Sequence, residues 1–244
     1  MWRFTPPPQR SNAYATAEAG RRVKTEMLVI AVAVGLVVTA GQATAQPQQT
    51  TSPASSASGT QRATTVGLFL AGGAVGLGAH EGGHLLFDVL FEADPGIRRV
   101  DFHGIPFFAI THRNDLAPGK EFTISSAGFW VQHAGSEWLL TQHPRLRHER
   151  SPLLKGLLAF NVLASGAYAG AAFVRTGPGE RDTRGMAVSS NLDERWIGVV
   201  ILVPAVLDSW RYFRPDSRAA VWMSRAAKLG GVLLTVRAAT RTRT

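Results

Sequence analysis

The 244-residue sequence contains no cysteine. Disulfides, thiolate metal sites, iron–sulfur clusters and a cysteine nucleophile are therefore excluded. Any bound metal ion would have to be held by histidine, aspartate, glutamate or water. Charged residues are also scarce, at 18% of the chain, and long stretches carry almost none of them.

These stretches are apolar runs that predict helices crossing a membrane. They cover residues 65–91, 122–140, 153–174 and 196–213, with a weaker run at 219–236. A spanning helix needs about 20 mostly apolar residues, a length that the first and third runs meet comfortably. We therefore predict an all-α polytopic membrane protein, in which a helix bundle is embedded in the lipid bilayer.

The chain also divides into segments of distinct composition. Residues 1–22 are rich in proline and polar residues and predict a disordered extension. Residues 23–45 contain a basic start, a short apolar core and a small-residue cleavage pattern. This combination is typical of a signal peptide or, if it is not cleaved, of a first membrane span. Residues 46–64 predict a flexible linker. The embedded domain then covers 65–236, and 237–244 form a basic tail.

One connection between the apolar runs carries a β-type pattern. Val100-Asp101-Phe102 alternates in polarity, and Phe107–Thr111 is rich in aromatic and β-branched residues. Gly104-Ile105-Pro106 lies between the two segments. The pattern predicts a small extramembrane β-hairpin within residues 99–112.

The net charge of +9 does not indicate a nucleic-acid partner. The cations gather at the ends of the apolar runs, and no recognisable nucleic-acid module accompanies them. Snorkelling or orienting charges at a membrane surface explain this distribution more simply.

The first apolar run contains the sequence GLGAHEGGHLLFDVLF at residues 76–91. His80, Glu81 and His84 form the pattern H-E-x-x-H. On a helix, His80 and His84 lie one turn apart on the same face, so both imidazoles can reach one metal ion. Glu81 can then address a water bound to that ion. Ionisable residues at bilayer depth are costly and usually mark function, so the pattern predicts a Zn²⁺ site.

Two histidines and a water leave one ligand of a tetrahedral zinc site to be found. Asp208 is the favoured candidate because it is an acid inside an apolar run, where an unpaired carboxylate is costly. A salt bridge with Arg211 or a buried helix cap is the alternative explanation for Asp208. Asp193 is the reserve candidate, although its polar surroundings are typical of a solvated acid. Asp88, one turn beyond His84, is expected to be a packing polar group and not a ligand.

These motifs resemble the site-2 protease family of intramembrane zinc metalloproteases, peptidase family M50. In that family one helix supplies two histidine ligands and a glutamate, a second carries Ala-Gly-Pro-x-x-Asn near the substrate, and a third carries Leu-Asp-Gly. The matching residues here are His80, Glu81 and His84, then Ala127-Gly128 with Gln132 at the asparagine position, and finally Leu207-Asp208.

The resemblance implies proteolysis of single-span membrane proteins in a bacterial-type inner membrane. Glu81 would be the general base, Asp208 would complete the ligand set of His80 and His84, and Gly128 and Gln132 would lie at the substrate. The sequence departs from the family at Phe129, Gln132 and Ser209. Three alternatives stay open: a soluble secreted zinc metallopeptidase, a catalytically inactive membrane scaffold, and a metal-binding or metal-transport membrane protein. No sequence feature fixes the oligomeric state.

The order of the runs raises a geometric question about Asp208. Two apolar runs separate the histidine helix from the Asp208 helix, so simple spans would make these two helices antiparallel. Their polar residues would then be offset by about 10 Å in depth. Either residues 122–140 form a re-entrant or partial span, or helix tilt and a break at Pro204 close the gap.

Overall fold

A computed structural model describes residues 57–102 and 105–240. The predicted N-terminal extension, the predicted signal peptide or first span, and residues 46–56 of the predicted linker lie outside the described residues. So do residues 241–244 of the predicted basic tail.

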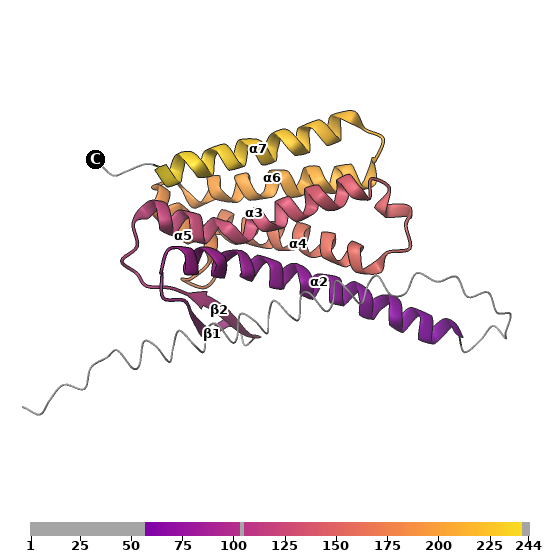
Figure 1. The fold of residues 1–244 in the computed structure, drawn as a ribbon, viewed down its shortest axis with the longest axis horizontal. Helices are drawn as coiled ribbons and strands as arrows, with labels where there is room; N and C mark the ends of the chain where they lie inside the picture. Colours follow the sequence, from indigo (N-terminus) through magenta and orange to yellow (C-terminus); the bar gives the residue numbers. More distant parts are fainter. Residues whose placement is uncertain (1–56, 103–104, 241–244) are drawn as a thin grey trace, which may run out of the picture. The chain divides into compact units, whose positions relative to one another are not determined.

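The described chain is a helix bundle with one two-stranded antiparallel sheet (Figure 1), which confirms the predicted fold class. The elements in chain order are α2 (Ala57–Leu90), β1 (Gly96–Phe102), β2 (Ile105–Thr111), α3 (Pro118–Gln142), η1 (Leu146–His148), α4 (Pro152–Val174), α5 (Asp182–Ser190), α6 (Glu194–Phe213) and α7 (Arg218–Thr240).

Within the described residues, three helices are long and apolar enough to cross a membrane. They are Gly59–Leu90 in α2, Pro152–Val174 in α4 and Glu194–Phe213 in α6. These helices are consistent with the predicted membrane protein.

Helix α3 is more polar, yet it is a continuous helix of 25 residues. At 1.5 Å per residue it is about 37 Å long, and it packs against α2, α4, α6 and α7. Its polar side chains, such as Ser126 and Ser136, are buried in the bundle, where partners can satisfy them. The structure therefore shows a continuous helix over 122–140 and not a re-entrant segment that turns back.

Contacts between α2 and α4 show that these two helices run parallel. The backbone of Phe69 lies against Gly156, and Gly76 lies against Phe160, so residue numbers rise together along the contact. A Cβ added at Gly156 would lie 1.9 Å from the Phe69 carbonyl oxygen. The two backbones therefore approach as closely as small residues in membrane helices allow.

The remaining long helices alternate in direction. Gly83 of α2 lies against Ala127 while His80 lies against Gly128, so α3 is antiparallel to α2. Gly198 at the start of α6 lies against Ala169 and Ala172 near the end of α4, so α6 is antiparallel to α4.

These directions bring the C-termini of α2 and α4 and the N-termini of α3 and α6 to one end of the bundle. We call this end the hairpin end, because β1 and β2 follow α2 in the chain and α5 follows α4. We call the opposite end the η1 end (Figure 1).

Two boundaries differ from the sequence prediction. Helix α2 begins at Ala57, so residues 57–64 belong to it and not to a linker. Helix α7 continues to Thr240, so residues 237–240 are helical and not part of a tail. Both segments are polar but contain no proline, and polarity alone does not interrupt a helix.

The predicted hairpin is confirmed, with a register from Gly96 opposite Thr111 to Phe102 opposite Ile105. The backbone N–H of Arg113 donates to the Ala93 carbonyl at 2.9 Å. This bond closes the base of the hairpin beside the end of α2.

Candidate metal centre

Three side chains converge at the hairpin end of the bundle. The Nε2 atoms of His80 and His84 lie 3.1 Å apart. The Oδ2 atom of Asp182, in α5, lies 3.2 Å from His80 Nε2 and 3.3 Å from His84 Nε2. We call these three residues the metal group, since among the described residues they form the cluster of histidine and acidic side chains that could hold a metal ion.

The spacing of the three donor atoms would fit a small divalent metal ion, zinc included. Ligand atoms about 2.0 Å from a tetrahedral zinc ion are about 3.3 Å apart. The separations of 3.1, 3.2 and 3.3 Å in the metal group are close to that value. A fourth tetrahedral position would be left for water, as in catalytic zinc sites.

The hydrogen bond at the far side of His84 fixes how its ring faces the metal group. His84 Nδ1 donates to the backbone oxygen of Ile124 at 2.7 Å, which leaves the Nε2 lone pair facing His80 and Asp182. A carbonyl acceptor of this kind is the usual partner of a metal-ligating histidine. Two imidazole nitrogens 3.1 Å apart are favourable only with a proton or a metal ion between them.

Aromatic side chains pack around His80. Its ring stacks on Tyr168 with centroids 5.7 Å apart and meets the edge of Phe129 at 5.3 Å. His80 is 2% exposed, so these rings fix its orientation and keep water from most of its surface.

The Asp182 carboxylate is ionised in this environment. Burial acts to raise its pKa, but the attraction of His84 and the contacts with both imidazoles outweigh burial and hold the pKa well below its usual range. Asp182 is therefore in the form that binds metal at neutral pH.

Residues on both sides of Asp182 are clamped by Glu194, at the start of α6. The Glu194 carboxylate accepts two hydrogen bonds from Arg181, each 2.7 Å long, and one from the Thr183 hydroxyl, also 2.7 Å. Because Arg181 and Thr183 flank Asp182, this clamp fixes the start of α5 against α6 and aims Asp182 at the histidines.

Glu81 lies beside the metal group. It is half-buried and close enough to His80, His84 and Asp182 to interact electrostatically with each. The neighbouring Gly82 has no atom within 4 Å of an added Cβ. The face of α2 next to Glu81 is therefore open to a ligand.

Gly128 lies at the metal group, where it lets α3 pack against the histidine rings. An added Cβ would lie 2.5 Å from His80 Cε1, 2.6 Å from His80 Nδ1 and 2.6 Å from His84 Nε2. The structure shows that Gly128 contacts both imidazoles, and its role at the substrate stays a prediction.

Gly128→Ala is expected to displace the two imidazoles and weaken zinc binding by about tenfold or more. Overpacking at such a contact also lowers the free energy of unfolding by about 1–3 kcal/mol. Gly82→Ala is the matched control, because its added methyl group meets no atom. Zinc affinity and thermal unfolding of the two variants, measured together, check this prediction, and equal zinc affinity in both would contradict it.

Gln132, the second predicted substrate residue, lies one turn beyond Gly128 on α3. It is 2% exposed, and its side-chain amide has no hydrogen-bond partner among the described residues. Its backbone oxygen accepts a hydrogen bond from Asn161 Nδ2 at 3.1 Å. The backbone of Gln132 therefore contacts α4, and the predicted role of its side chain at the substrate stays a prediction.

The structure also places Asp208, the favoured third ligand, away from the metal group. Its carboxylate accepts hydrogen bonds from Lys228 Nζ and Ser224 Oγ, both 2.7 Å long. Helices α2 and α6 are antiparallel, so Asp208 lies in the η1-end half of α6 while the histidines lie in the hairpin-end half of α2. Its ion-pair partner is Lys228 and not Arg211.

The other two acids considered from the sequence have structural roles. Asp193 is exposed and caps α6, with its Oδ1 accepting from the backbone N–H of Arg195 at 3.0 Å. Asp88 is fully buried and lies 3.3 Å from His112, whose Nε2 bonds Glu121 at 2.7 Å. His112 thus links the base of the hairpin to α2 and α3.

Asp182 was missed by the sequence analysis because an acid in a polar connection is typical of solvent-exposed surface. One signal could have identified it. The connection after α4 returns to the end of the bundle where α2 finishes, because those helices are parallel. An acid in residues 175–193 is therefore at the right depth for His80 and His84, whereas one late in α6 is not.

No family model, curated protein or solved structure matches this chain. Its resemblance to site-2 proteases therefore rests on the motif residues alone, and the acid beside the histidines is Asp182 and not Asp208 at the family's aspartate position.

Proposed function

We propose that this protein is a zinc-dependent peptidase that hydrolyses peptide bonds of membrane-associated protein substrates. The observation that carries the proposal is the triangle of His80, His84 and Asp182, with Glu81 beside it on the same helix. Two histidines, one carboxylate and an adjacent glutamate are the parts that metal-assisted hydrolysis requires.

Each residue has a separate role in this proposal. His80, His84 and Asp182 would hold the ion, and bound zinc lowers the pKa of a coordinated water towards neutrality. Glu81 would accept the proton of the attacking water and deliver it to the leaving amine. His84 would be oriented by the Ile124 carbonyl, and Asp182 by the clamp of Glu194 on Arg181 and Thr183.

The surroundings of the site favour an extended polypeptide as substrate. Helix α2 is open at Gly82, and β1 and β2 form a two-stranded sheet whose outer edges have no further strand among the described residues. An extended segment could add to such an edge by main-chain hydrogen bonds. Arg98 of β1 pairs with Glu180, which links the hairpin to the segment carrying Asp182.

The three apolar helices favour membrane-spanning proteins as substrates, because such substrates would share the bilayer with the enzyme. A bacterial-type inner membrane and an N-terminal signal within residues 23–45 complete the proposal.

A metal-binding membrane protein without protease activity is the second candidate. The observation that favours it is the pairing of Asp208, at the position of the family's aspartate ligand, with Lys228. Such a protein, or an inactive scaffold, would keep the fold and lack peptide hydrolysis.

Removal of the metal distinguishes these candidates. The detergent-purified protein is expected to hold about one zinc ion per chain, and to cleave members of a library of quenched-fluorescence peptides. A chelator should remove both the zinc and the cleavage, and added zinc should restore them. His80→Ala should lack both. Folded wild-type protein that binds no zinc would refute the proposal, whereas zinc without chelator-sensitive cleavage would support the second candidate.

A further inference from the structure

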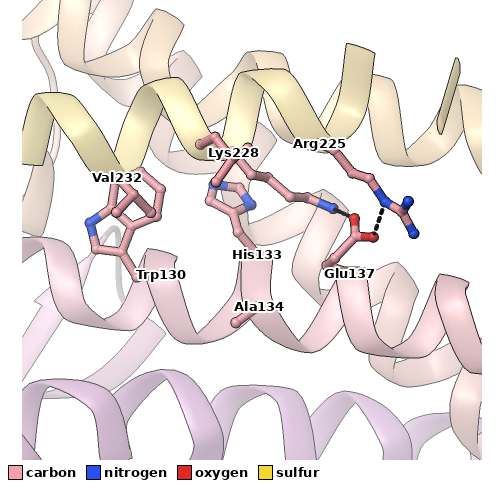
Figure 2. A pocket seen from close by; sticks show the side chains of 8 residues that line it. Trp130, His133, Ala134, Glu137, Arg225, Lys228 and Val232 are labelled. Atoms are coloured by element: carbon pink, nitrogen blue, oxygen red, sulfur yellow. Dashed lines mark hydrogen bonds and ion pairs between the residues drawn. The ribbon is translucent and has the colours of Figure 1, made fainter. Parts of the chain in front are cut away.

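A second site lies between α3 and α7, where the two helices leave a cavity of about 660 Å³ (Figure 2). We call it the α3–α7 groove. Its apolar lining comes from Trp130 and Ala134 of α3 and from Leu229 and Val232 of α7. Its polar lining includes Glu137, Arg225 and Lys228, which lie together at one end of the view in Figure 2.

The polar part of the groove belongs to an ionic cluster with more cations than carboxylates. Glu137 accepts hydrogen bonds from Arg211, Arg225 and Lys228 at 2.8, 2.9 and 2.9 Å. Lys228 also bonds Asp208 at 2.7 Å. Three cations therefore share two carboxylates, which leaves one positive charge in excess.

Arg225 is the cation of this cluster that a ligand can reach. Its side chain is 39% exposed, whereas those of Arg211 and Lys228 are 6% and 10% exposed. An excess positive charge beside apolar surface is costly. The groove is therefore complementary to an anion that brings apolar surface with it.

Exposed tryptophans indicate the depth of this cation in the membrane. Trp138 of α3, Trp210 of α6 and Trp222 of α7 are all exposed and all lie towards the η1 end of their helices. Tryptophan of this kind gathers at the headgroup level of a bilayer.

Arg225 lies at the same level and the apolar lining lies deeper. Arg225 follows Trp222 by three residues, or about 4.5 Å along the helix. Val232 follows Trp222 by ten residues, so it lies about 15 Å deeper. Along the groove, a cation at headgroup level is thus followed by apolar side chains at acyl-chain level.

We propose that the α3–α7 groove binds one anionic phospholipid from the leaflet at the η1 end. Its phosphate pairs with Arg225, beside Lys228, and one acyl chain runs along Trp130, Leu229 and Val232. This site uses none of the residues of the metal group, so it does not depend on the proposed peptidase activity.

Lipid selectivity of the full detergent-purified chain tests this assignment. Short-chain phosphatidylglycerol and phosphatidylcholine are titrated separately, and binding is measured by the shift in thermal unfolding. We expect wild-type protein to bind phosphatidylglycerol about fivefold more tightly, the preference that one interfacial cation provides.

Three variants locate the site. Arg225→Gln should abolish the preference while the remaining cations keep Glu137 paired. Ala134→Phe fills the groove without changing its charge and should weaken binding of both lipids. Arg150→Gln removes an exposed cation near η1, outside the groove, and should keep the wild-type preference.

Several results would overturn the assignment. Equal binding of both lipids by wild-type protein would remove the anionic preference, and an equal loss in Arg150→Gln would indicate diffuse surface charge. An identical shift with inorganic phosphate would show that no lipid chain is bound. A cross-linked dimer that excludes both lipids would show that a second copy fills the groove.

Discussion

Asp182→Asn protein is expected to lose its zinc, whereas Asp208→Asn protein is expected to keep it. Among the described residues, only the Asp182 carboxylate lies within 3.3 Å of both histidines, while Asp208 is held by Lys228 and Ser224. Zinc binding contributes about 10–16 kcal/mol in sites with four protein ligands. One ligand then accounts for roughly 3 kcal/mol, so zinc affinity should fall more than about a hundredfold in Asp182→Asn.

Zinc per chain and the zinc dissociation constant from chelator competition measure this difference. The two substitutions are matched, since each replaces a buried or half-buried carboxylate with an amide of the same shape. Thermal unfolding in the absence of zinc identifies any variant that has lost its fold. Retention of zinc by Asp182→Asn, with loss in Asp208→Asn, would restore Asp208 as the third ligand and refute the metal group.

Glu81→Gln is expected to keep bound zinc and to lose peptide hydrolysis by a factor of about 100–10,000, the range that general acid–base catalysis contributes. Glu81 lies beside the metal group but offers none of its three donor atoms. Glutamine fills the same volume and cannot accept the proton from water. The proposed reaction therefore loses its base while the ion stays in place.

Hydrolysis rates and zinc content are measured on the same preparations, with Glu92→Gln as the matched control. Glu92 is exposed just after α2, so its substitution should change neither quantity. Unchanged hydrolysis in Glu81→Gln would exclude it as the base. Loss of zinc in Glu81→Gln would instead assign Glu81 to the ligand set.

The apolar runs predicted the positions of the helices well. Average hydropathy was a poorer guide to which helices pack in the centre of the bundle. Helix α3 contains Ser126, Gln132 and Ser136 and is not among the three helices apolar enough to cross a membrane, yet it packs against four other long helices. Its polar residues are tolerated because they face the bundle interior. A hydropathy average includes such residues regardless of whether their side chains face the lipid or the bundle interior.

The sequence alone determined the features that depend on neighbours along the chain. Helical periodicity puts His80 and His84 one turn apart on one face with Glu81 next to them, and alternation over Val100–Phe102 predicts the first strand of the hairpin. Run length predicts α2 and α4 as helices long enough to span a bilayer. Each of these features follows from interactions over a few residues.

Only the tertiary structure decided which distant residues meet. Because α2 and α4 run parallel, the connection after α4 brings Asp182, and not Asp208, to the histidines. The approach of α3 likewise places Gly128 against both imidazoles. Helix tilt and packing are set by contacts between segments far apart in the chain, and no local pattern contains them.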